Sequence, residues 1–217
     1  MCLKKIANKS IALALAGAFI VTPLFNMVSA TEGVKDYKKM CIENYEEVME
    51  FDGVIYKYQY SLDKNGNQIT KIINTSTGKE DVLTFMDNKV LLNNENFASI
   101  ESTMDTPSTI TQRKMNEMNE WINSGTYHKT IKWESNGEGY LVLAVISQAM
   151  SLSQKLVKAA VGIGIFNTIA SYCNGGTLHY STWYYMSLLS TTHRYDWSFK
   201  ASSGKRWGTY HIQFNEY

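Results

Sequence analysis

The sequence has little cysteine and proline and almost no net charge. Only three cysteines and two prolines occur in 217 residues, and 21 basic against 20 acidic residues give a formal charge of +1. Two cysteines as far apart as Cys41 and Cys173 match no zinc-ligand spacing. Without a strong field of one sign, we expect no binding to nucleic acid and no global attraction to an anionic membrane.

Catalytic motifs are also missing. The chain has no HExxH pair, no GxSxG elbow and no phosphate-binding glycine loop. All four histidines fall in predicted strands: His128, His179, His193 and His211. A sheet could bring two of them together, although histidines in strands are usually ordinary polar residues. We therefore expect no enzyme activity, no catalytic residue, no cofactor and no metal site. A thiol dyad of Cys173 with His179 is the one enzymatic alternative.

Residues Met1 to Ala30 have the pattern of a secretory signal peptide. Lys4, Lys5 and Lys9 precede a short apolar run, and Val28-Ser29-Ala30 supplies small residues at the cleavage positions. Removing these three lysines leaves 18 basic against 20 acidic residues, a formal charge of −2. The sequence predicts a secreted, extracellular protein that begins at Thr31.

Two cysteines remain after this cleavage. Outside the cell Cys41 and Cys173 could form a disulfide between the N-terminal region and the end of the central segment. Two separate buried thiols are the alternative.

Residues 31–100 are expected to form a helix followed by a β-meander. Gly33 to Glu50 repeats apolar residues at helical spacing. Period-two alternation then predicts strands over Val54–Leu62, Gln68–Asn74, Val82–Met86 and Lys89–Leu92. The Asp63–Asn67 stretch contains a glycine, as a hairpin turn does. A calcium loop needs a glycine at its sixth position and a glutamate at its twelfth, and this stretch has neither there.

Residues 109–217 are expected to form a second region. The polar stretch Asn93 to Ser108 contains Pro107 and is the predicted linker. Thr109 to Asn123 has an amphipathic helical stripe, and Tyr127 to Glu134 alternates as a strand.

The stretch Tyr140 to Tyr172 is the most apolar part of the chain, and its only charges are Lys155 and Lys158. As one helix it would run roughly 50 Å at about 1.5 Å per residue, longer than a bilayer core of about 30 Å. Broken near Lys155–Lys158 or Gly162–Gly164, each arm would be too short to cross. We expect a buried helix or helical hairpin, and membrane engagement after a conformational change is the alternative. The residues that would form such a membrane-active segment are Leu141, Val145, Leu152, Lys155, Lys158, Ile163, Ile165 and Phe166.

After Gly176 the chain becomes rich in aromatic residues. Strands are predicted over Leu178–Leu189, His193–Lys200 and Trp207–Phe214, with one wet face and one face that covers the central helices. The expected class is α+β, with an N-terminal antiparallel β-meander and a C-terminal domain. In that domain a central apolar helix or helical hairpin packs on an aromatic antiparallel sheet.

The strand "TIKW", the segment Ala159–Ser171 and the tail "YYMSLLSTTHRYDWSFKASSG" together resemble the geobacillin-type large secreted bacteriocins and related secreted proteins of Gram-positive bacteria. The resemblance implies antibacterial activity without enzymatic chemistry, by an unsettled mechanism. The partner that we expect is the membrane or envelope of a target cell, reached through the central apolar helices. The alternative is a secreted envelope-binding module that uses the aromatic C-terminal sheet on a glycan or a protein. The oligomeric state is left open.

Overall fold

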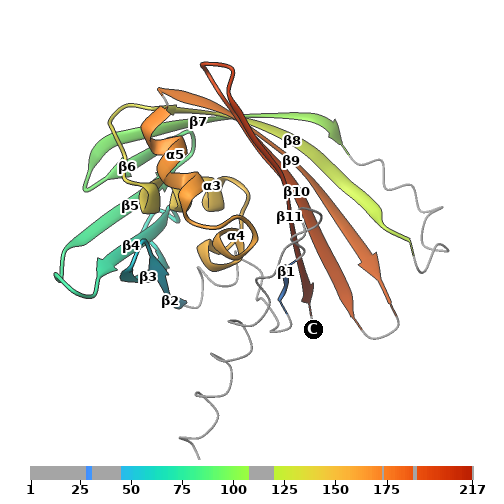
Figure 1. The fold of residues 1–217 in the computed structure, drawn as a ribbon, viewed down its shortest axis with the longest axis horizontal. Coiled ribbons are helices and arrows are strands. Elements are labelled where there is room, and N and C mark those ends of the chain that lie inside the picture. The colour runs from blue at the N-terminus through green and yellow to red at the C-terminus, as the bar shows by residue number, and fades with distance from the viewer. Residues whose placement is uncertain (1–27, 31–44, 108–119, 173, 188–189, 217) are drawn as a thin grey trace, which may run out of the picture.

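The computed structural model describes residues 28–30, 45–107, 120–172, 174–187 and 190–216. In this part of the chain eleven strands form one sheet in the order β1-β11-β10-β9-β8-β7-β6-β5-β4-β3-β2. Strands β2 to β11 pair antiparallel in chain order, and β1 (Val28–Ala30) adds to β11 in parallel. The sheet curves around three helices, which lie on its concave side (Figure 1). The α+β class is therefore confirmed.

The first strands form the predicted meander. They are β2 (Glu46–Phe51), β3 (Val54–Leu62), β4 (Gln68–Asn74), β5 (Glu80–Met86) and β6 (Lys89–Leu92). Alternate residues of β3 point into the core, where Tyr56, Tyr58 and Tyr60 are buried. The hairpin turn after β3 is also as predicted: the Asp63 carboxylate accepts hydrogen bonds from the backbone N–H groups of Asn65 and Asn67.

Three predictions before residue 124 are wrong where the structure describes them. The helix predicted over Gly33–Glu50 is strand β2 from Glu46 onward, and residues 33–44 lie outside the described part. The predicted linker is strand β7 (Glu95–Pro107), which pairs with β6 and with β8 (Ile122–Trp133). The end of the helix predicted over Thr109–Asn123 is also part of β8, while residues 108–119 are outside the described ranges.

The central apolar segment forms three short helices: α3 (Gly139–Ala149), α4 (Gln154–Val161) and α5 (Gly164–Tyr172). The first break comes earlier than predicted, because Ser151 takes a positive φ of 57° and Ser153 caps α4 by accepting from the Leu156 N–H at 3.3 Å. Gly162, at φ 76°, ends α4 near the second predicted break. No single helix in the described ranges could cross a membrane by length and composition. The pair α3 and α4 passes that test together but is bent by 110°.

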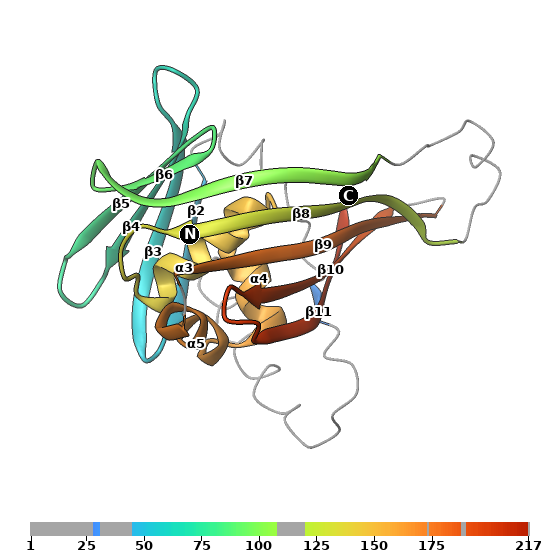
Figure 2. The same cartoon turned by 90° about the horizontal axis from the view of Figure 1, so that it is seen from above.

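The helices are inserted between β8 and β9 (Gly175–Met186), which are nonetheless neighbours in the sheet. Viewed from above, α3, α4 and α5 lie against one side of the sheet, between the β2–β6 and β8–β11 parts (Figure 2). Tyr140 of α3 stacks on Tyr56 with ring centroids 4.6 Å apart, and its hydroxyl donates to Asp81 Oδ2 at 2.6 Å. On the other side the Tyr180 hydroxyl donates to the Ala149 carbonyl at 3.4 Å. The helices therefore contact both parts of the sheet.

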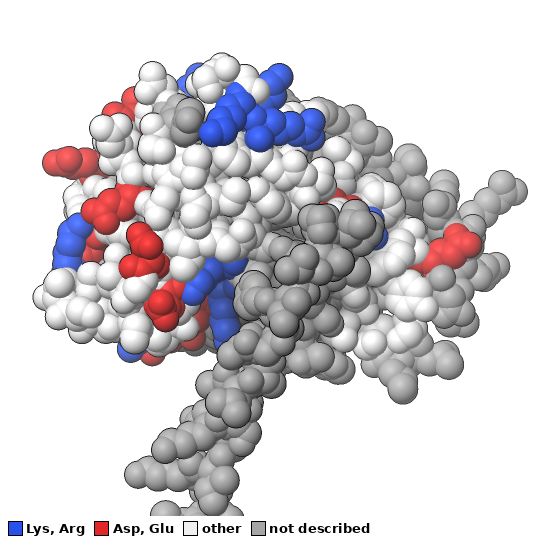
Figure 3. All heavy atoms as spheres, in the orientation of Figure 1, with Lys and Arg blue, Asp and Glu red and all other residues white. Residues whose placement is uncertain are grey.

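The C-terminal strands follow the predicted alternation. Strands β9, β10 (Thr191–Ala201) and β11 (Arg206–Glu216) form antiparallel ladders, with a register shift in β10 between Trp197 and Phe199. Leu178, Trp197 and Phe199 are buried on the concave side. Acidic side chains gather over the β2–β6 side and basic ones at the top of the view, so this face carries no uniform charge (Figure 3).

Candidate functional site

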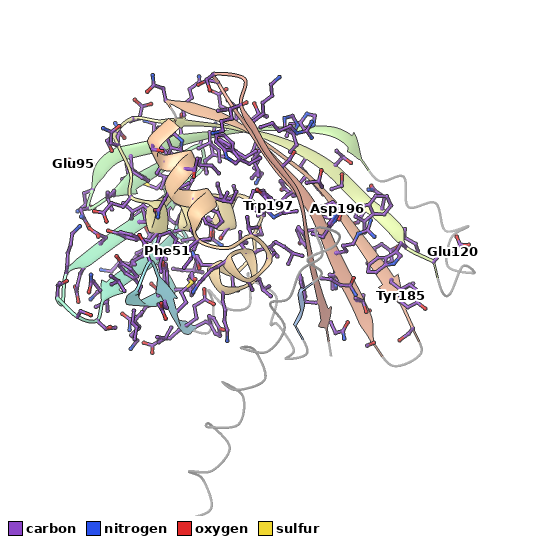
Figure 4. All side chains as sticks on the ribbon, viewed as in Figure 1. Phe51, Glu95, Glu120, Tyr185, Asp196 and Trp197 are labelled. Carbon is purple, nitrogen blue, oxygen red and sulfur yellow. The ribbon has the colours of Figure 1, made fainter. Side chains whose placement is uncertain are left out.

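The convex face of β8 to β11 carries polar and aromatic side chains that do not belong to the core. Residues two apart along these strands share a face. Trp197 points toward the helices, whereas its neighbour Asp196 lies on the opposite side of β10 (Figure 4). The convex face therefore presents Arg194, Asp196 and their register partners on β9 and β11.

Six side chains form a connected group on this face, which we call the outer cluster. Its members are Trp121, Trp183, Tyr185, Arg194, Asp196 and His211.

Arg194 lies between two indole rings of the outer cluster. Its guanidinium carbon is 5.1 Å from the ring centroid of Trp121 and 5.2 Å from that of Trp183. Trp121 also contacts Tyr185, with ring centroids 5.7 Å apart. A guanidinium within about 6 Å of an aromatic centroid is attracted to the ring face. These contacts hold the three rings and the cation in a fixed arrangement.

Asp196 joins the cation to the neighbouring strand. Its Oδ2 accepts from an Arg194 terminal nitrogen at 2.9 Å, and its Oδ1 lies 2.6 Å from His211 Nδ1. The Arg194, Asp196 and His211 side chains are 26%, 17% and 34% exposed. The charged groups are therefore ordered by their neighbours but still accessible to a ligand.

Three buried polar atoms, two in the outer cluster and one next to it, have no hydrogen-bond partner within the described ranges. They are Trp183 Nε1, Arg194 Nε and Gln213 Oε1. Trp183 pairs with Arg194 and Arg194 pairs with Gln213, so the three residues form one row across β9, β10 and β11. Buried polar groups are normally satisfied by protein, water or ligand. Two donors and an acceptor in one row could therefore be met by a ligand or by ordered water.

The same face offers a serine, an aspartate and a histidine, but in the wrong order for nucleophilic catalysis. Ser181 pairs with Asp196, which pairs with His211, so the acid stands between the other two. In a catalytic triad the histidine must stand between the nucleophile and the acid to accept the proton. The arrangement suits binding, not proton transfer from Ser181.

A second polar group lies inside the molecule, under the start of α4. Glu47 is buried, and its Oε1 accepts from the Tyr60 hydroxyl and from the Lys155 N–H at 3.4 Å. Burial raises the pKa of Glu47, although the hydrogen bonds from Tyr60 and from the α4 backbone act in the opposite direction. Glu47 Oε2 and both amide atoms of buried Gln154 have no partner in the part of the chain that the structure describes. This carboxyl group ties β2 to α4.

Half of the predicted membrane-active residues lie in the core. Four of the eight are buried: Leu141, Val145, Leu152 and Phe166. The other four are Lys155, which is exposed, and the partly exposed Lys158, Ile163 and Ile165. The Lys158 amine donates to the Glu50 carbonyl of β2, so this lysine also anchors α4 to the sheet.

Neither cysteine of the predicted disulfide, Cys41 or Cys173, belongs to the described residues. Their linkage stays a prediction that non-reducing peptide mapping can check, and the Cys173–His179 dyad is equally outside what the structure describes. No group of three or more His, Cys, Asp or Glu side chains suited to a metal occurs in the described ranges.

All four histidines lie in strands, as expected, and β8 and β9 bring His128 beside His179. The outer cluster itself was missed. Alternation along β10 places Arg194 and Asp196 on the wet face, but the residues of β8, β9 and β11 that meet them depend on register.

No family model, no curated protein and no solved structure matches this chain.

Proposed function

We propose that the protein is a secreted binding module of the bacterial envelope that holds a hydroxyl-rich glycan on the outer cluster. The observation that carries this proposal is Arg194, held between Trp121 and Trp183 and fixed by Asp196. Flat aromatic faces next to ordered charged donors and acceptors are the combination that binds sugar rings: the apolar ring face stacks on an indole, and the hydroxyls meet the charged groups.

The polar atoms in and next to the cluster support the same ligand class. A sugar hydroxyl both donates and accepts, so it could satisfy these two donors and one acceptor if the side chains turn to expose them. An apolar ligand would leave these atoms as they are in the free protein, so it would gain nothing from them.

The test is a pull-down and titration of the purified secreted protein with insoluble cell-wall preparations, before and after removal of their anionic polymers. Trp183→Ala removes one ring of the sandwich and should weaken binding at least about tenfold, roughly 1.4 kcal/mol. Ile55→Ala is the matched control, because Ile55 is an exposed apolar residue on β3, at 48%. Equal binding by the Trp183→Ala variant and the wild type would refute the proposal.

Membrane perturbation by the central helices is the second candidate, favoured by the apolar composition of the α3–α4 pair. It would require release of α3, whose residues Leu143, Val145 and Ile146 are fully buried. A disulfide that joins α3 to the sheet should then abolish killing and membrane depolarisation of Gram-positive cells. If the locked protein acts as well as the unlocked one, helix release is not the mechanism.

A further inference from the structure

A pair of histidines stands side by side on the convex face of β8 and β9. His128 and His179 are register partners, and their rings meet edge to face with centroids 4.2 Å apart and planes at 76°. The pairs on either side of them, Lys129 with Leu178 and Tyr127 with Tyr180, continue the same register without a bulge. The two imidazoles are therefore carried by an uninterrupted ladder.

We propose that His128 and His179 form a binding site for a divalent transition-metal ion. Opposite residues of an antiparallel pair have Cβ atoms about 4.5–5.5 Å apart, which lets two imidazole nitrogens reach one ion at about 2.0–2.1 Å each. The final side-chain torsion of histidine is soft, so both rings can turn toward a shared ion without moving the backbone. The inference does not depend on the proposed glycan binding.

The ligand set decides which metals fit. Two imidazoles suit Cu²⁺, Ni²⁺ and Zn²⁺, whereas Ca²⁺ and Mg²⁺ prefer oxygen ligands. Since no group of three or more His, Cys, Asp or Glu side chains suited to a metal occurs within the described ranges, water would complete the coordination of an ion on the pair. Cu²⁺ should bind more tightly than Zn²⁺, following the general order of affinities of divalent ions.

The surroundings of the pair are polar. Thr126 and Ser181, one step along the same face, have their hydroxyl oxygens 3.0 Å apart. Ser198 is the register partner of His179 on β10. These hydroxyl groups can accept hydrogen bonds from metal-bound water, a role that outer-shell groups commonly play.

Metal binding has to compete with protons, because an imidazole binds a metal only after it loses its proton. Affinity should therefore fall as the solution is acidified. A simple ring contact between His128 and His179 predicts no metal binding at any pH.

The experiment uses the untagged secreted protein, titrated calorimetrically with Zn²⁺ and followed by electron paramagnetic resonance with Cu²⁺. We expect about one ion per chain and nitrogen hyperfine structure in the Cu²⁺ spectrum. His128→Ala and His179→Ala should each weaken binding at least about tenfold, and the double variant should abolish it.

His193→Ala is the matched control, since His193 packs on Phe214 with ring centroids 5.4 Å apart and is not part of the pair. It should bind as the wild type does. Circular dichroism and urea denaturation establish that each variant folds. Unchanged binding by the folded double variant, or no binding to the wild type at millimolar metal, overturns the proposal.

Discussion

The hydrogen bond between α3 and β5 gives the sharpest stability prediction. The Tyr140 hydroxyl donates to Asp81 Oδ2 at 2.6 Å, and both residues are buried. Tyr140→Phe removes this hydroxyl alone. The ring should keep its stacking on Tyr56 and its edge contact with Phe51, at centroid distances of 4.6 Å and 6.4 Å.

The magnitude follows from the acceptor. A hydrogen bond to a charged group contributes about 1.5–3 kcal/mol. Asp81 keeps two other donors in the variant, the Lys79 amine and the Asn93 amide, each at 3.2 Å. We therefore expect a loss near the lower end, about 1.5–2 kcal/mol. With a urea slope of about 2 kcal/mol per molar, the midpoint falls by roughly 0.8–1 M.

The same bond affects the response to acid. Burial acts to raise the pKa of Asp81, but the hydrogen bonds from Tyr140, Asn93 and Lys79 outweigh it and hold the pKa below its ordinary value of 3.8. A carboxyl group with a lowered pKa in the folded state contributes stability that is present at neutral pH and is lost as the pH falls through the folded pKa. Tyr140→Phe should make this acid-dependent loss smaller.

The control is a double-mutant cycle with Asp81→Ala. That variant leaves the Tyr140 hydroxyl buried without its acceptor, so adding Tyr140→Phe to it should cost nothing or recover stability. Full additivity of the two substitutions, or a loss below about 0.5 kcal/mol for Tyr140→Phe alone, would refute the assignment.

Three further predictions concern other parts of the fold. Gly139→Ala should destabilise the protein by about 1–3 kcal/mol in urea, because its new Cβ would lie 2.0 Å from Asn167 Oδ1, whereas Gly164→Ala, with open space around its Cβ, should be neutral or slightly stabilising. Glu47→Gln should flatten the pH dependence of unfolding above pH 4.5. The pKa of Glu47 is raised in the folded state, so its protonated form stabilises the wild type below the ordinary pKa of 4.5. This contribution is lost as the pH rises through the folded-state pKa. Parallel wild-type and variant profiles would contradict this. Intact mass of the secreted protein should begin at Thr31, and a mass that retains the preceding residues would contradict cleavage there.

The predicted cleavage after Ala30 would change one edge of the sheet. Strand β1 consists of Val28–Ala30, the last residues of the predicted signal peptide, and it pairs in parallel with Ile212–Phe214. Its removal would leave β11 as an edge strand. An exposed edge can pair with another chain.

The sequence by itself determined the strands in which apolar and polar residues alternate cleanly. Strand β10 is an example, because Trp197 and Phe199 had to share one face and Arg194 and Asp196 the other. The sequence also determined that the apolar segment 140–172 would be helical and largely buried, since lysines occur only near its middle and its length fits no single membrane span.

The tertiary structure alone decided β2. Its alternation is inverted with respect to hydrophobicity: Glu47 is buried, while Val48 is 57% exposed. The short run therefore fitted a helical stripe better than a strand. Glu47 can be buried only because the Tyr60 hydroxyl and the start of α4 meet it there, and both come from elsewhere in the chain.

Register is the other property that the sequence did not determine. The outer cluster needs Trp121 before β8, Trp183 on β9 and Arg194 on β10, and the histidine pair needs His128 opposite His179. Strands β8 and β9 are separated in sequence by all three helices, yet they become neighbours because the helices fold back into the curve of the sheet. A shift of one residue would turn every one of these side chains to the other face. Local periodicity can assign a residue to a face, but only the packing of the whole sheet around its helices decides which residues meet there.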